Sequence, residues 1–424
     1  MKNYIDLAYE PQKNDLVCEY LVHPLRIPLS VAANHIAGES SIDTWTDIQT
    51  LSESIRLKLM PHVFHINNKT NTVRIAYHSD LFEKGNMPQI FSSIAGNVFG
   101  LSTLKSLRLQ DVSFPKNMVK SFQGPRMGVR GVRKLLDIHD RPMVGTIVKP
   151  KLGLTARQHA QVAYNAWVGG VDCVKDDENL TSMNFNKFYE RVDLTLKMRE
   201  KAEAETGERK AYMPNITAEA SEMIKRLHYV HERSGNYVMV DILTVGWSAL
   251  QTVRNHSILP IHAHRAMHAA LTKTPEHGIS MVFLAKVARL IGVDSLHIGT
   301  AKLGKMGGSV EEVLSTERVI QRNNVEQDSD NHVLKQKWYG TKPVIAVASG
   351  GLQPAALPML IARMGKNVLC NFGGGIHAHP DGTTAGAKAV RQALDATMRN
   401  VPLREYAERH AELAAAIKKW GVPS

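Results

Sequence analysis

Eight short apolar runs follow one another from about residue 141 onward, and they constrain the fold of this chain more than any other feature. Each run is rich in residues that favour β-strands. The runs cover residues 144–148, 171–174, 211–216, 237–243, 259–264, 295–298, 344–348 and 368–372. Helical patterns separate most of them, at 184–204 and 281–291 with an amphipathic spacing, and at 155–168 with a capping-box start and a Gly-Gly end. Alternating strands and helices in this number predict a (β/α)8 barrel.

The remaining residues predict a second, smaller domain. A barrel of this kind takes about 250 residues, and the chain has 424. Residues 1–120 mix strand-like segments, such as 71–77, with helical stretches, such as 87–99. We therefore predict an α/β protein, with an N-terminal α+β domain over residues 1–120 and a C-terminal (β/α)8 TIM barrel over residues 121–424. The apolar spacing at 403–420 predicts helix packing at the end of the barrel domain.

Polar residues follow nearly every predicted barrel strand at the point where the strand ends. In such barrels the active site forms at the C-terminal ends of the strands, and phosphate is often bound by the loops after strands seven and eight. Glycine-rich motifs stand at those two places, where backbone N–H groups can approach phosphate oxygens. The polar groups, in strand order, are Lys149 and Lys151, residues 175–178, Asn215, His262 with His264 and Arg265, His297 with residues 304–308, residues 349–351, and residues 373–375.

The second strand ends in one lysine and three consecutive carboxylates, within G-G-V-D-C-V-K-D-D-E-N at 169–179. Side chains alternate along a strand, so Lys175 and Asp177 share a face and Glu178 follows at the strand end. Two carboxylates that converge in this way predict a magnesium site. The ammonium group of Lys175 would compete with the metal, and the residues of this stretch alone leave that conflict open.

Each of these features also has a structural interpretation. Lys149 and Lys151 could be a solvated strand end, His264 and His268 could be core histidines, and residues 373–375 could form a plain turn. The clusters at 39–46 and 96–100 are typical of helix caps and turns. His262 and His264 resemble the metal pair of barrel amidohydrolases, but there the pair follows the first strand and here it follows the fifth. If all of the structural interpretations were correct, these features would lie together at one end of one barrel by accident. This counts against the structural interpretations.

Composition excludes few classes of function. The net charge is +12, and its basic residues are scattered among acids, which fits phosphorylated small substrates as well as nucleic acid. A basic nucleic-acid-binding protein stays an alternative, which predicts salt-dependent retention on DNA and leaves the polar barrel end unexplained. The first residues do not resemble a signal peptide, no apolar run approaches ~18 residues, and Cys18, Cys173 and Cys370 lie far apart. We expect a cytoplasmic protein that binds neither membrane nor nucleic acid.

The motifs together carry a specific resemblance. In the barrel they are G-T-I-V-K-P-K-L-G-L (145–154), G-G-V-D-C-V-K-D-D-E-N (169–179), H-A-H-R-A-M-H (262–268), H-I-G-T (297–300), G-K-M (304–306), S-G-G (349–351) and G-G-G (373–375). E-S-S-I-D-T-W-T (39–46) and G-N-V-F-G (96–100) precede them. In this order they resemble the large subunit of ribulose-1,5-bisphosphate carboxylase/oxygenase, rubisco, and in character its archaeal form III branch. The resemblance covers essentially the whole chain and implies that the N-terminal domain is ferredoxin-like.

The resemblance resolves the conflict at Lys175. It implies that the Lys175 amine captures an activating CO2 as a carbamate (N6-carboxylysine) and then binds one Mg²⁺ per site together with Asp177 and Glu178. Lys149 would remove the C3 proton of the substrate, and Lys151 would support it. His264 would take part in proton transfer and hydration, and Lys305 would close over the site on a mobile loop.

The resemblance also implies two phosphate sites. One would use Arg265, His268 and His297, with Ser349 on a substrate hydroxyl; the other would use Thr44, Trp45, Gly351, Gly373 and Gly374, with Gly350 beside them. Glu39, Thr44, Trp45 and Asn97 would come from a partner subunit. We therefore expect a homodimer or a ring of dimers with shared active sites and without a small subunit.

The expected reaction is the magnesium-dependent carboxylation of ribulose-1,5-bisphosphate to two molecules of 3-phosphoglycerate, with O2 as a competing substrate. The alternative is a rubisco-like enolase or isomerase that acts on a related sugar phosphate. The chain departs from the family pattern at Asp43, Ile147 and Ala378, and Gly307 replaces the glutamate that normally follows the G-K-M motif. The additional glycine is expected to raise the cost of ordering the mobile loop.

Overall fold

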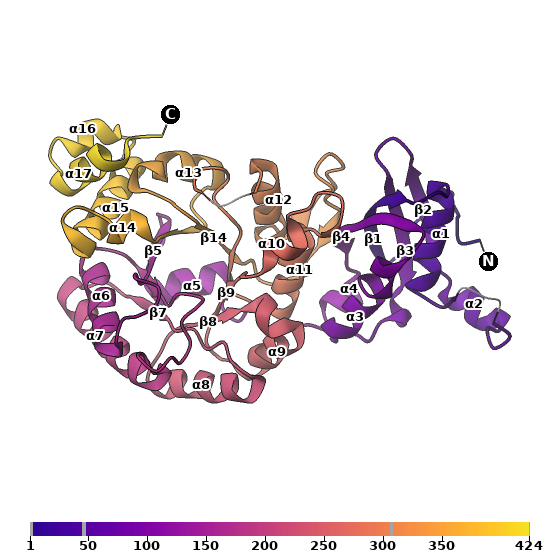
Figure 1. The fold of residues 1–424 in the computed structure, drawn as a ribbon, viewed down its shortest axis with the longest axis horizontal. Coiled ribbons are helices and arrows are strands. Elements are labelled where there is room, and N and C mark those ends of the chain that lie inside the picture. The colour runs from indigo at the N-terminus through magenta and orange to yellow at the C-terminus, as the bar shows by residue number, and fades with distance from the viewer. Residues whose placement is uncertain (1–2, 45–47, 306–307, 424) are drawn as a thin grey trace. The chain divides into compact units, whose positions relative to one another are not determined.

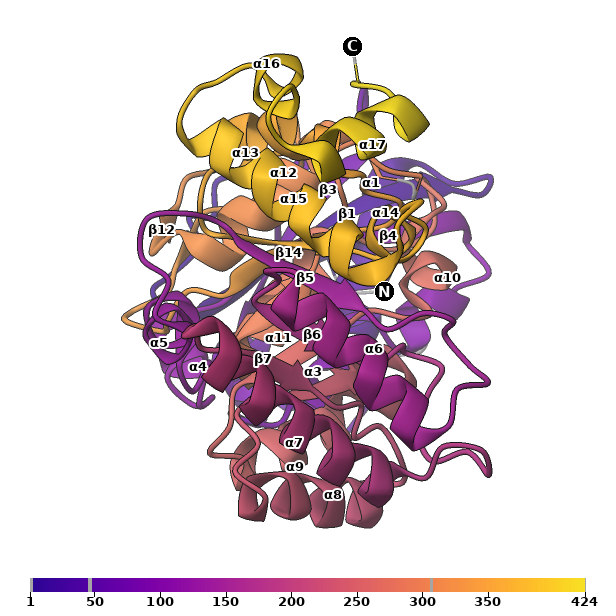
Figure 2. The ribbon, with the colours of Figure 1, turned by 90° about the vertical axis from the view of Figure 1, so that its left-hand side faces the viewer.

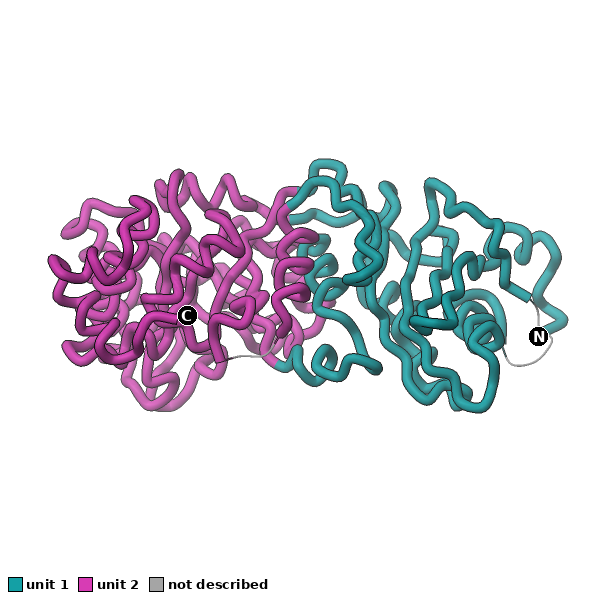
Figure 3. The backbone as a smooth tube through the Cα atoms, turned by 90° about the horizontal axis from the view of Figure 1, so that it is seen from above, with its two compact units in different colours: residues 1–124, 267–291, 322–341 teal, residues 125–266, 292–321, 342–424 magenta. Residues whose placement is uncertain are grey.

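The computed structural model describes residues 3–44, 48–305 and 308–423 (Figure 1). Their contacts divide the chain into two compact units, drawn in different colours in Figure 3. The first unit contains residues 1–124, 267–291 and 322–341, and the second contains residues 125–266, 292–321 and 342–424. The first unit thus includes two segments from late in the chain. The division of the sequence near residue 120 stays a prediction.

The first unit is built on a five-stranded sheet in the order β10-β4-β1-β3-β2. β4, β1, β3 and β2 pair antiparallel, and helices connect β1 to β2 and β3 to β4, which is the ferredoxin-like βαββαβ arrangement. β10 extends the sheet parallel to β4. The elements are β1 Asp15–Pro24, α1 Leu29–Glu39, α2 Glu53–Leu59, β2 His62–Asn67, β3 Thr72–His78, η1 Ser79–Leu81, α3 Met87–Ile94, η2 Asn97–Gly100, β4 Leu104–Ser113, α4 Lys116–Val119, α10 His268–Thr272, β10 Gly278–Ile279, α11 Met281–Ile291, β12 Asn324–Val325 and β13 Gln336–Lys337.

Two helical predictions need correction in this unit. The stretch 87–99 is one helix only as far as Ile94, and a separate 3-10 turn follows it. The amphipathic pattern predicted for α11 does not mark an exposed face, because every one of its residues is buried. Its charged side chains are matched inside the unit: Lys286 Nζ lies 2.6 Å from Asp111 Oδ2, and the guanidinium of Arg289 lies 4.1 Å from the centre of the Trp338 ring.

The second unit contains an eight-stranded parallel sheet in the order β7-β6-β5-β15-β14-β11-β9-β8. A bridge between Asn215 and Met239, with Ile216 N donating to Met239 O at 3.0 Å, joins the chain after β7 to β8 and closes the barrel. All eight predicted strand runs are confirmed. The strands are β5 Met143–Ile147, β6 Cys173–Lys175, β7 Ala211–Met213, β8 Val238–Asp241, β9 Ile261–His264, β11 Ser295–His297, β14 Ile345–Ser349 and β15 Val368–Phe372.

Helices cover the outside of the barrel, with α6 and α7 side by side (Figure 2). The predicted capping box is confirmed, because Thr155 Oγ1 accepts from Gln158 N and Gln158 Oε1 accepts from Thr155 N. The C-terminal tail forms two helices that pack on α15. The helices are α5 Gly128–Leu136, α6 Ala156–Val168, α7 Phe188–Thr206, α8 Ala220–Glu232, α9 Ile242–His256, α12 Val310–Gln321, η3 Pro354–Ala356, α13 Leu357–Met364, α14 Gly374–His377, α15 Gly382–Met398, α16 Leu403–Ala407 and α17 Ala411–Trp420. No helix in the described residues is long and apolar enough to span a membrane.

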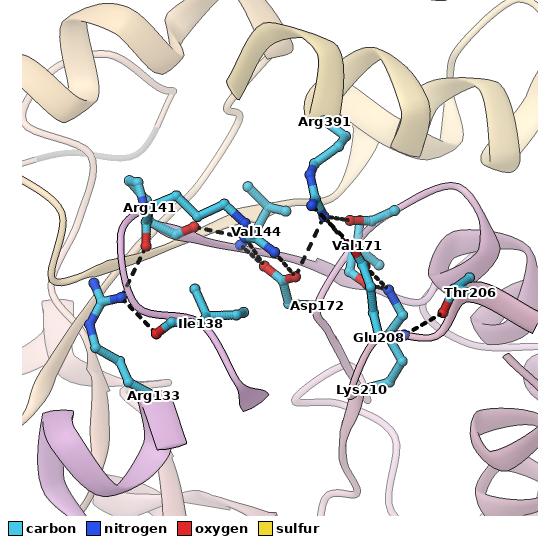
Figure 4. A network of polar contacts seen from close by, with 12 residues as sticks. Arg133, Ile138, Arg141, Val144, Val171, Asp172, Thr206, Glu208, Lys210 and Arg391 are labelled. Atoms are coloured by element: carbon cyan, nitrogen blue, oxygen red, sulfur yellow. Dashed lines mark hydrogen bonds and ion pairs between the residues drawn. The ribbon is translucent and has the colours of Figure 1, made fainter. Parts of the chain in front are cut away.

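The N-terminal end of the barrel is closed by apolar packing and fixed ion pairs. Val129, Val132 and Leu136 of α5 join one apolar core with Met143 and Cys173, the first residues of β5 and β6. Just before β6, the two carboxylate oxygens of Asp172 accept from Arg141 at 2.7 Å each, and one of them also accepts from Val144 N (Figure 4). Arg391 pairs with Glu208 in the same network. This end of the barrel is therefore held by matched charges.

Candidate active site

Lys175 ends β6 at the opposite, C-terminal end of the barrel. Its side chain is 2% exposed, and its Nζ donates to the backbone oxygen of Asp176 at 2.8 Å. The same Nζ lies 3.4 Å from Glu178 Oε2 and 3.5 Å from Met239 Sδ. The amine thus lies within reach of a carboxylate, a backbone carbonyl and the thioether of Met239.

Asp177 is held by a second lysine. Lys149 Nζ, just after β5, lies 2.6 Å from Asp177 Oδ2. The other carboxylate oxygen of Asp177 accepts from the backbone and side-chain nitrogens of Asn179, at 3.1 and 3.0 Å. Burial raises the pKa of Asp177, but the hydrogen bonds from Lys149 and Asn179 outweigh it and leave that pKa below its ordinary value. Asp177 is therefore a carboxylate.

Glu178 and His264 complete the group. Glu178 Oε2 lies 3.5 Å from His264 Nε2, and His264 Nδ1 lies 2.9 Å from Asp241 Oδ1. Burial raises the pKa of Glu178, but the charges of Lys175 and His264 outweigh this effect and leave the pKa below its ordinary value. Its side chain is 30% exposed, which leaves it open to a ligand.

The described residues contain no group of three or more His, Cys, Asp and Glu side chains placed to hold a metal ion. Asp177 and Glu178 supply two carboxylates, and Mg²⁺ prefers several oxygen ligands in near-octahedral geometry. The third side chain at this place is Lys175, and an unmodified lysine offers a magnesium ion no anionic oxygen. The residues therefore fit a magnesium ion on condition that Lys175 gains an anionic oxygen group.

A cluster of histidines lies beside this group. His262 and His297 are buried, their Nε2 atoms are 2.8 Å apart, and the rings of His264 and His297 have centroids 4.7 Å apart. Sequence reasoning counted His262 among the polar residues at this end of the barrel and considered it as half of a metal pair, but assigned it no role in the site. Strand alternation places His262 and His264 on one face of β9, and that spacing was the available signal. Arg265 is also buried, and burial lowers its pKa to about 10 against the opposing charge of Glu312.

The loops after β11, β14 and β15 lie close to one another. Lys305 N donates to Gly350 O at 2.8 Å, and a Cβ atom on Gly351 would lie 3.0 Å from Lys305 N, so no larger residue fits there without movement. A Cβ atom on Gly373 would lie 3.5 Å from Lys149 Cε. Ser349 is the last residue of β14, and Gly374 is the first of α14. The predicted residues of these loops are thus grouped at one end of the barrel.

The structure places the other predicted site residues that it describes outside the group around Lys175 and Asp177. Glu39 and Thr44 line one pocket of the first unit, where Asp43 accepts from Tyr4 Oη at 2.7 Å and from Thr44 N at 2.9 Å. The unusual Asp43 thus fixes the backbone of Thr44. Asn97 starts η2 and His268 starts α10, both in the first unit; Lys151 is exposed after β5. Trp45 and Gly307 lie outside the described residues.

Comparison with protein families gives two matches that together span almost the whole chain. Residues 3–118 match the N-terminal domain of the ribulose bisphosphate carboxylase large chain, and residues 128–420 match its catalytic domain. Proteins named ribulose bisphosphate carboxylase from Methanosarcina acetivorans and Methanocaldococcus jannaschii are 53% and 49% identical to this chain. These matches cover 99% of this chain and 99% and 100% of those relatives.

Solved structures agree with the sequence comparison. The dimeric archaeal rubisco from Hyperthermus butylicus has a TM-score of 0.94 at 42% identity, and the match covers 99% of both chains. An octameric rubisco from Pyrococcus horikoshii, solved with sulfate ion, has a TM-score of 0.92 at 44% identity, with 99% of this chain and 96% of that one covered. These relatives are archaeal, in keeping with the form III-like resemblance. This chain belongs to the ribulose bisphosphate carboxylase large chain family.

Proposed function

We propose that this protein is a carbon–carbon lyase that carboxylates ribulose-1,5-bisphosphate to two molecules of 3-phosphoglycerate, with an oxygenase side reaction. One observation carries the proposal: two lysine–carboxylate pairs, Lys149 with Asp177 and Lys175 with Glu178, meet beside His264 at the C-terminal end of the barrel. Two lysines beside carboxylates at one end of the barrel suit a reaction that needs both a base and a modified metal ligand.

Lys175 is proposed to react as a neutral amine with activator CO2, forming an N–C bond and releasing a proton. The resulting carbamate oxygen, with Asp177 and Glu178, would hold one Mg²⁺ per site. When bound, the metal would supply positive charge that stabilises the enediolate form of the substrate. Lys175 is buried, and its Nζ lies 3.5 Å from Met239 Sδ, so little solvent competes with CO2 for the amine.

Lys149 is proposed to be the group that takes the C3 proton of the substrate. Its Nζ pairs with Asp177 in this structure, so carbamylation and metal binding would release it from that carboxylate. Lys151 would support it. His264, between Asp241 and Glu178, would move protons during hydration, and Lys305 would close the site from the loop after β11.

The substrate phosphates are proposed to bind at two places. Arg265, His268 and His297 would hold one phosphate, with Ser349 on a hydroxyl group. The backbone of Gly351, Gly373 and Gly374, with Thr44 and Trp45, would hold the other. Gly350 would also bind the substrate. The absence of Cβ atoms at these glycines supports close approach of an anion to backbone N–H groups.

A homodimer, or a ring of dimers, is proposed to share its active sites between subunits without a small subunit, in the cytoplasm. Glu39, Thr44, Trp45 and Asn97 would then come from the partner subunit. The dimeric and octameric states of two structural relatives support this assembly. Mixing inactive Glu39→Gln chains with inactive Lys175→Met chains should restore activity, since a hybrid contains one intact site. No recovery after verified subunit exchange would contradict shared sites.

The direct test is incubation with labelled CO2, Mg²⁺ and ribulose-1,5-bisphosphate under anoxia. We expect labelled 3-phosphoglycerate from the wild type and none from Lys175→Ala. The enolase or isomerase alternative predicts consumption or isomerisation of the sugar phosphate without label. Folded, metal-loaded protein that makes no labelled product would falsify the proposed reaction.

A further inference from the structure

A chain of buried hydrogen bonds runs from the core of the barrel to His297. Tyr237 Oη lies 3.0 Å from Ser295 Oγ, and Ser295 Oγ lies 2.9 Å from His262 Nδ1. His262 Nε2 then lies 2.8 Å from His297 Nε2. The four side chains come from β8, β9 and β11 or the residue just before them, and all four residues are buried. We call this set the Tyr237–His297 relay.

The positions of the protons in the relay follow from counting donors and acceptors. Each contact needs one proton and one lone pair. Among the described residues, Ser295 Oγ is the hydrogen-bond partner of Tyr237 Oη, so the phenolic proton points to Ser295. The Ser295 proton then points to His262 Nδ1, and His262 Nε2–H donates to His297 Nε2. Every other order leaves one buried hydroxyl proton without an acceptor, which is destabilising.

This order determines the tautomer of His297. Its Nε2 accepts a hydrogen bond, so its own proton is on Nδ1. That nitrogen has no hydrogen-bond partner among the described residues, and it is not fully buried. The positive charge of Arg265 also acts on His297, so the Nδ1–H group of His297 and the guanidinium of Arg265 lie near each other.

We propose that Ser295 and His262 are positioning residues that hold His297 as a neutral Nδ1–H donor for a phosphate oxygen of the substrate. This inference rests on the proposed function, because it deepens the role of His297 at that site. The opposite tautomer would present a lone pair to the anion and repel it. The relay therefore gives phosphate affinity to a histidine without giving it a charge.

The first test reads the tautomer without any turnover. In protein with 15N-labelled histidine and no substrate, His297 Nδ1 should show the shift of a protonated nitrogen and Nε2 that of an unprotonated one. The His297→Gln variant assigns the signals. Protonated Nε2 in the wild type would overturn the inference. Because this readout needs no carboxylation, a correct tautomer in a protein that makes no phosphoglycerate would contradict only the proposed reaction.

The second test separates positioning from folding. Ser295→Ala removes the proton that His262 Nδ1 accepts, so it should raise the KM for ribulose-1,5-bisphosphate about tenfold and change kcat by less than about twofold, the size expected for one weakened bond to a charged group. Tyr237→Phe leaves the Ser295 proton with His262 Nδ1 as its acceptor and should change this KM by less than about twofold. Tyr20→Phe is the matched control, since Tyr20 is a buried tyrosine whose hydroxyl donates to Ile94 O in the first unit. Its KM should not change. Folded Ser295→Ala with an unchanged KM would overturn the inference. If the variant fails to fold, the tautomer measured in the wild type decides.

Discussion

The two ends of strand β6 carry carboxylates that are paired in opposite ways. Before the strand, Asp172 is held by both terminal nitrogens of Arg141 at 2.7 Å each. After it, Asp177 and Glu178 are paired with Lys149 and Lys175. Arginine stays charged and keeps a planar, two-pronged geometry, whereas a lysine can lose its proton and react. The arginine end fixes the barrel, and the lysine end keeps the capacity for chemistry.

Asp176 shows how sharply these roles change along the chain. It lies between Lys175 and Asp177, is fully buried, and accepts from Arg191 Nε at 3.1 Å, Tyr212 Oη at 2.7 Å and Asn215 N at 2.9 Å. Burial raises its pKa, but Arg191 and His159 outweigh that effect and the pKa lies far below its ordinary value. One carboxylate of three consecutive ones therefore anchors the turn, and the next two are presented to the site.

The largest expected effect comes from removing Lys175. Lys175→Ala should lose tight Mg²⁺ binding and at least about 10³-fold of carboxylation, because the third anionic ligand cannot form. Lys175→Arg should lose both as well, although it keeps the positive charge. Equilibrium dialysis with Mg²⁺ and CO2, beside the labelled-CO2 assay, measures the two losses. Retained metal affinity in Lys175→Arg would show that the difference between arginine and lysine has no role here.

Lys149→Ala should separate proton abstraction from metal binding. We expect it to bind CO2 and Mg²⁺ and to lose about 10²–10⁴-fold in exchange of the C3 proton of ribulose bisphosphate with solvent, the usual contribution of a positioned base. Isotope exchange into the substrate measures this step directly. Exchange at the wild-type rate would assign the base to another group.

A substitution at the Arg141–Asp172 pair before β6 should change the stability of the protein and not its chemistry. Asp172→Asn leaves Arg141 without its buried partner and should lower the free energy of unfolding by ~3–5 kcal/mol. Denaturant unfolding measures the loss, and Mg²⁺ affinity of the folded protein should be unchanged. Asp177→Asn is the matched variant at the other end, with the reverse pattern: a smaller loss of stability and a loss of metal affinity. Equal patterns in the two variants would remove the distinction between the ends.

The smallest effect is expected at Gly307, which lies outside the described residues. Gly307→Glu restores the side chain usual in the family and should make the loop after β11 easier to order over the substrate. We expect a modest rise in the ratio of carboxylation to oxygenation, measured with both gases present. An unchanged ratio would count against a role for this glycine in selectivity.

The sequence predicted the barrel well because each strand is short, apolar and followed by a polar residue, which are local properties. It failed where partners are distant in the chain. Lys286 and Arg289 gave α11 the pattern of an exposed face, although Asp111 and Trp338 match them in the core. The role of His262 was not predicted for the same reason, since Ser295 and His297 reach it from another strand.

The candidate site shows the same limit. The motif at 169–179 located Lys175, Asp177 and Glu178, and the structure brings Lys149 and His264 to them. The residues alone could not say how a lysine and a metal share one place; the family resemblance supplied the carbamate. The pairing of Asp43 with Tyr4 and Thr44 also needed coordinates, because Asp43 looked only like a departure from a motif.

The central claim is that Lys175 reacts with CO2 to complete the metal site. The most direct measurement is 13C NMR of the protein with 13CO2 and Mg²⁺, in the wild type, Lys149→Ala and Lys175→Arg. The account predicts a magnesium-dependent carbamate signal in the first two proteins and none in the third. A wild type that forms phosphoglycerate from labelled CO2 without any carbamate signal would contradict it.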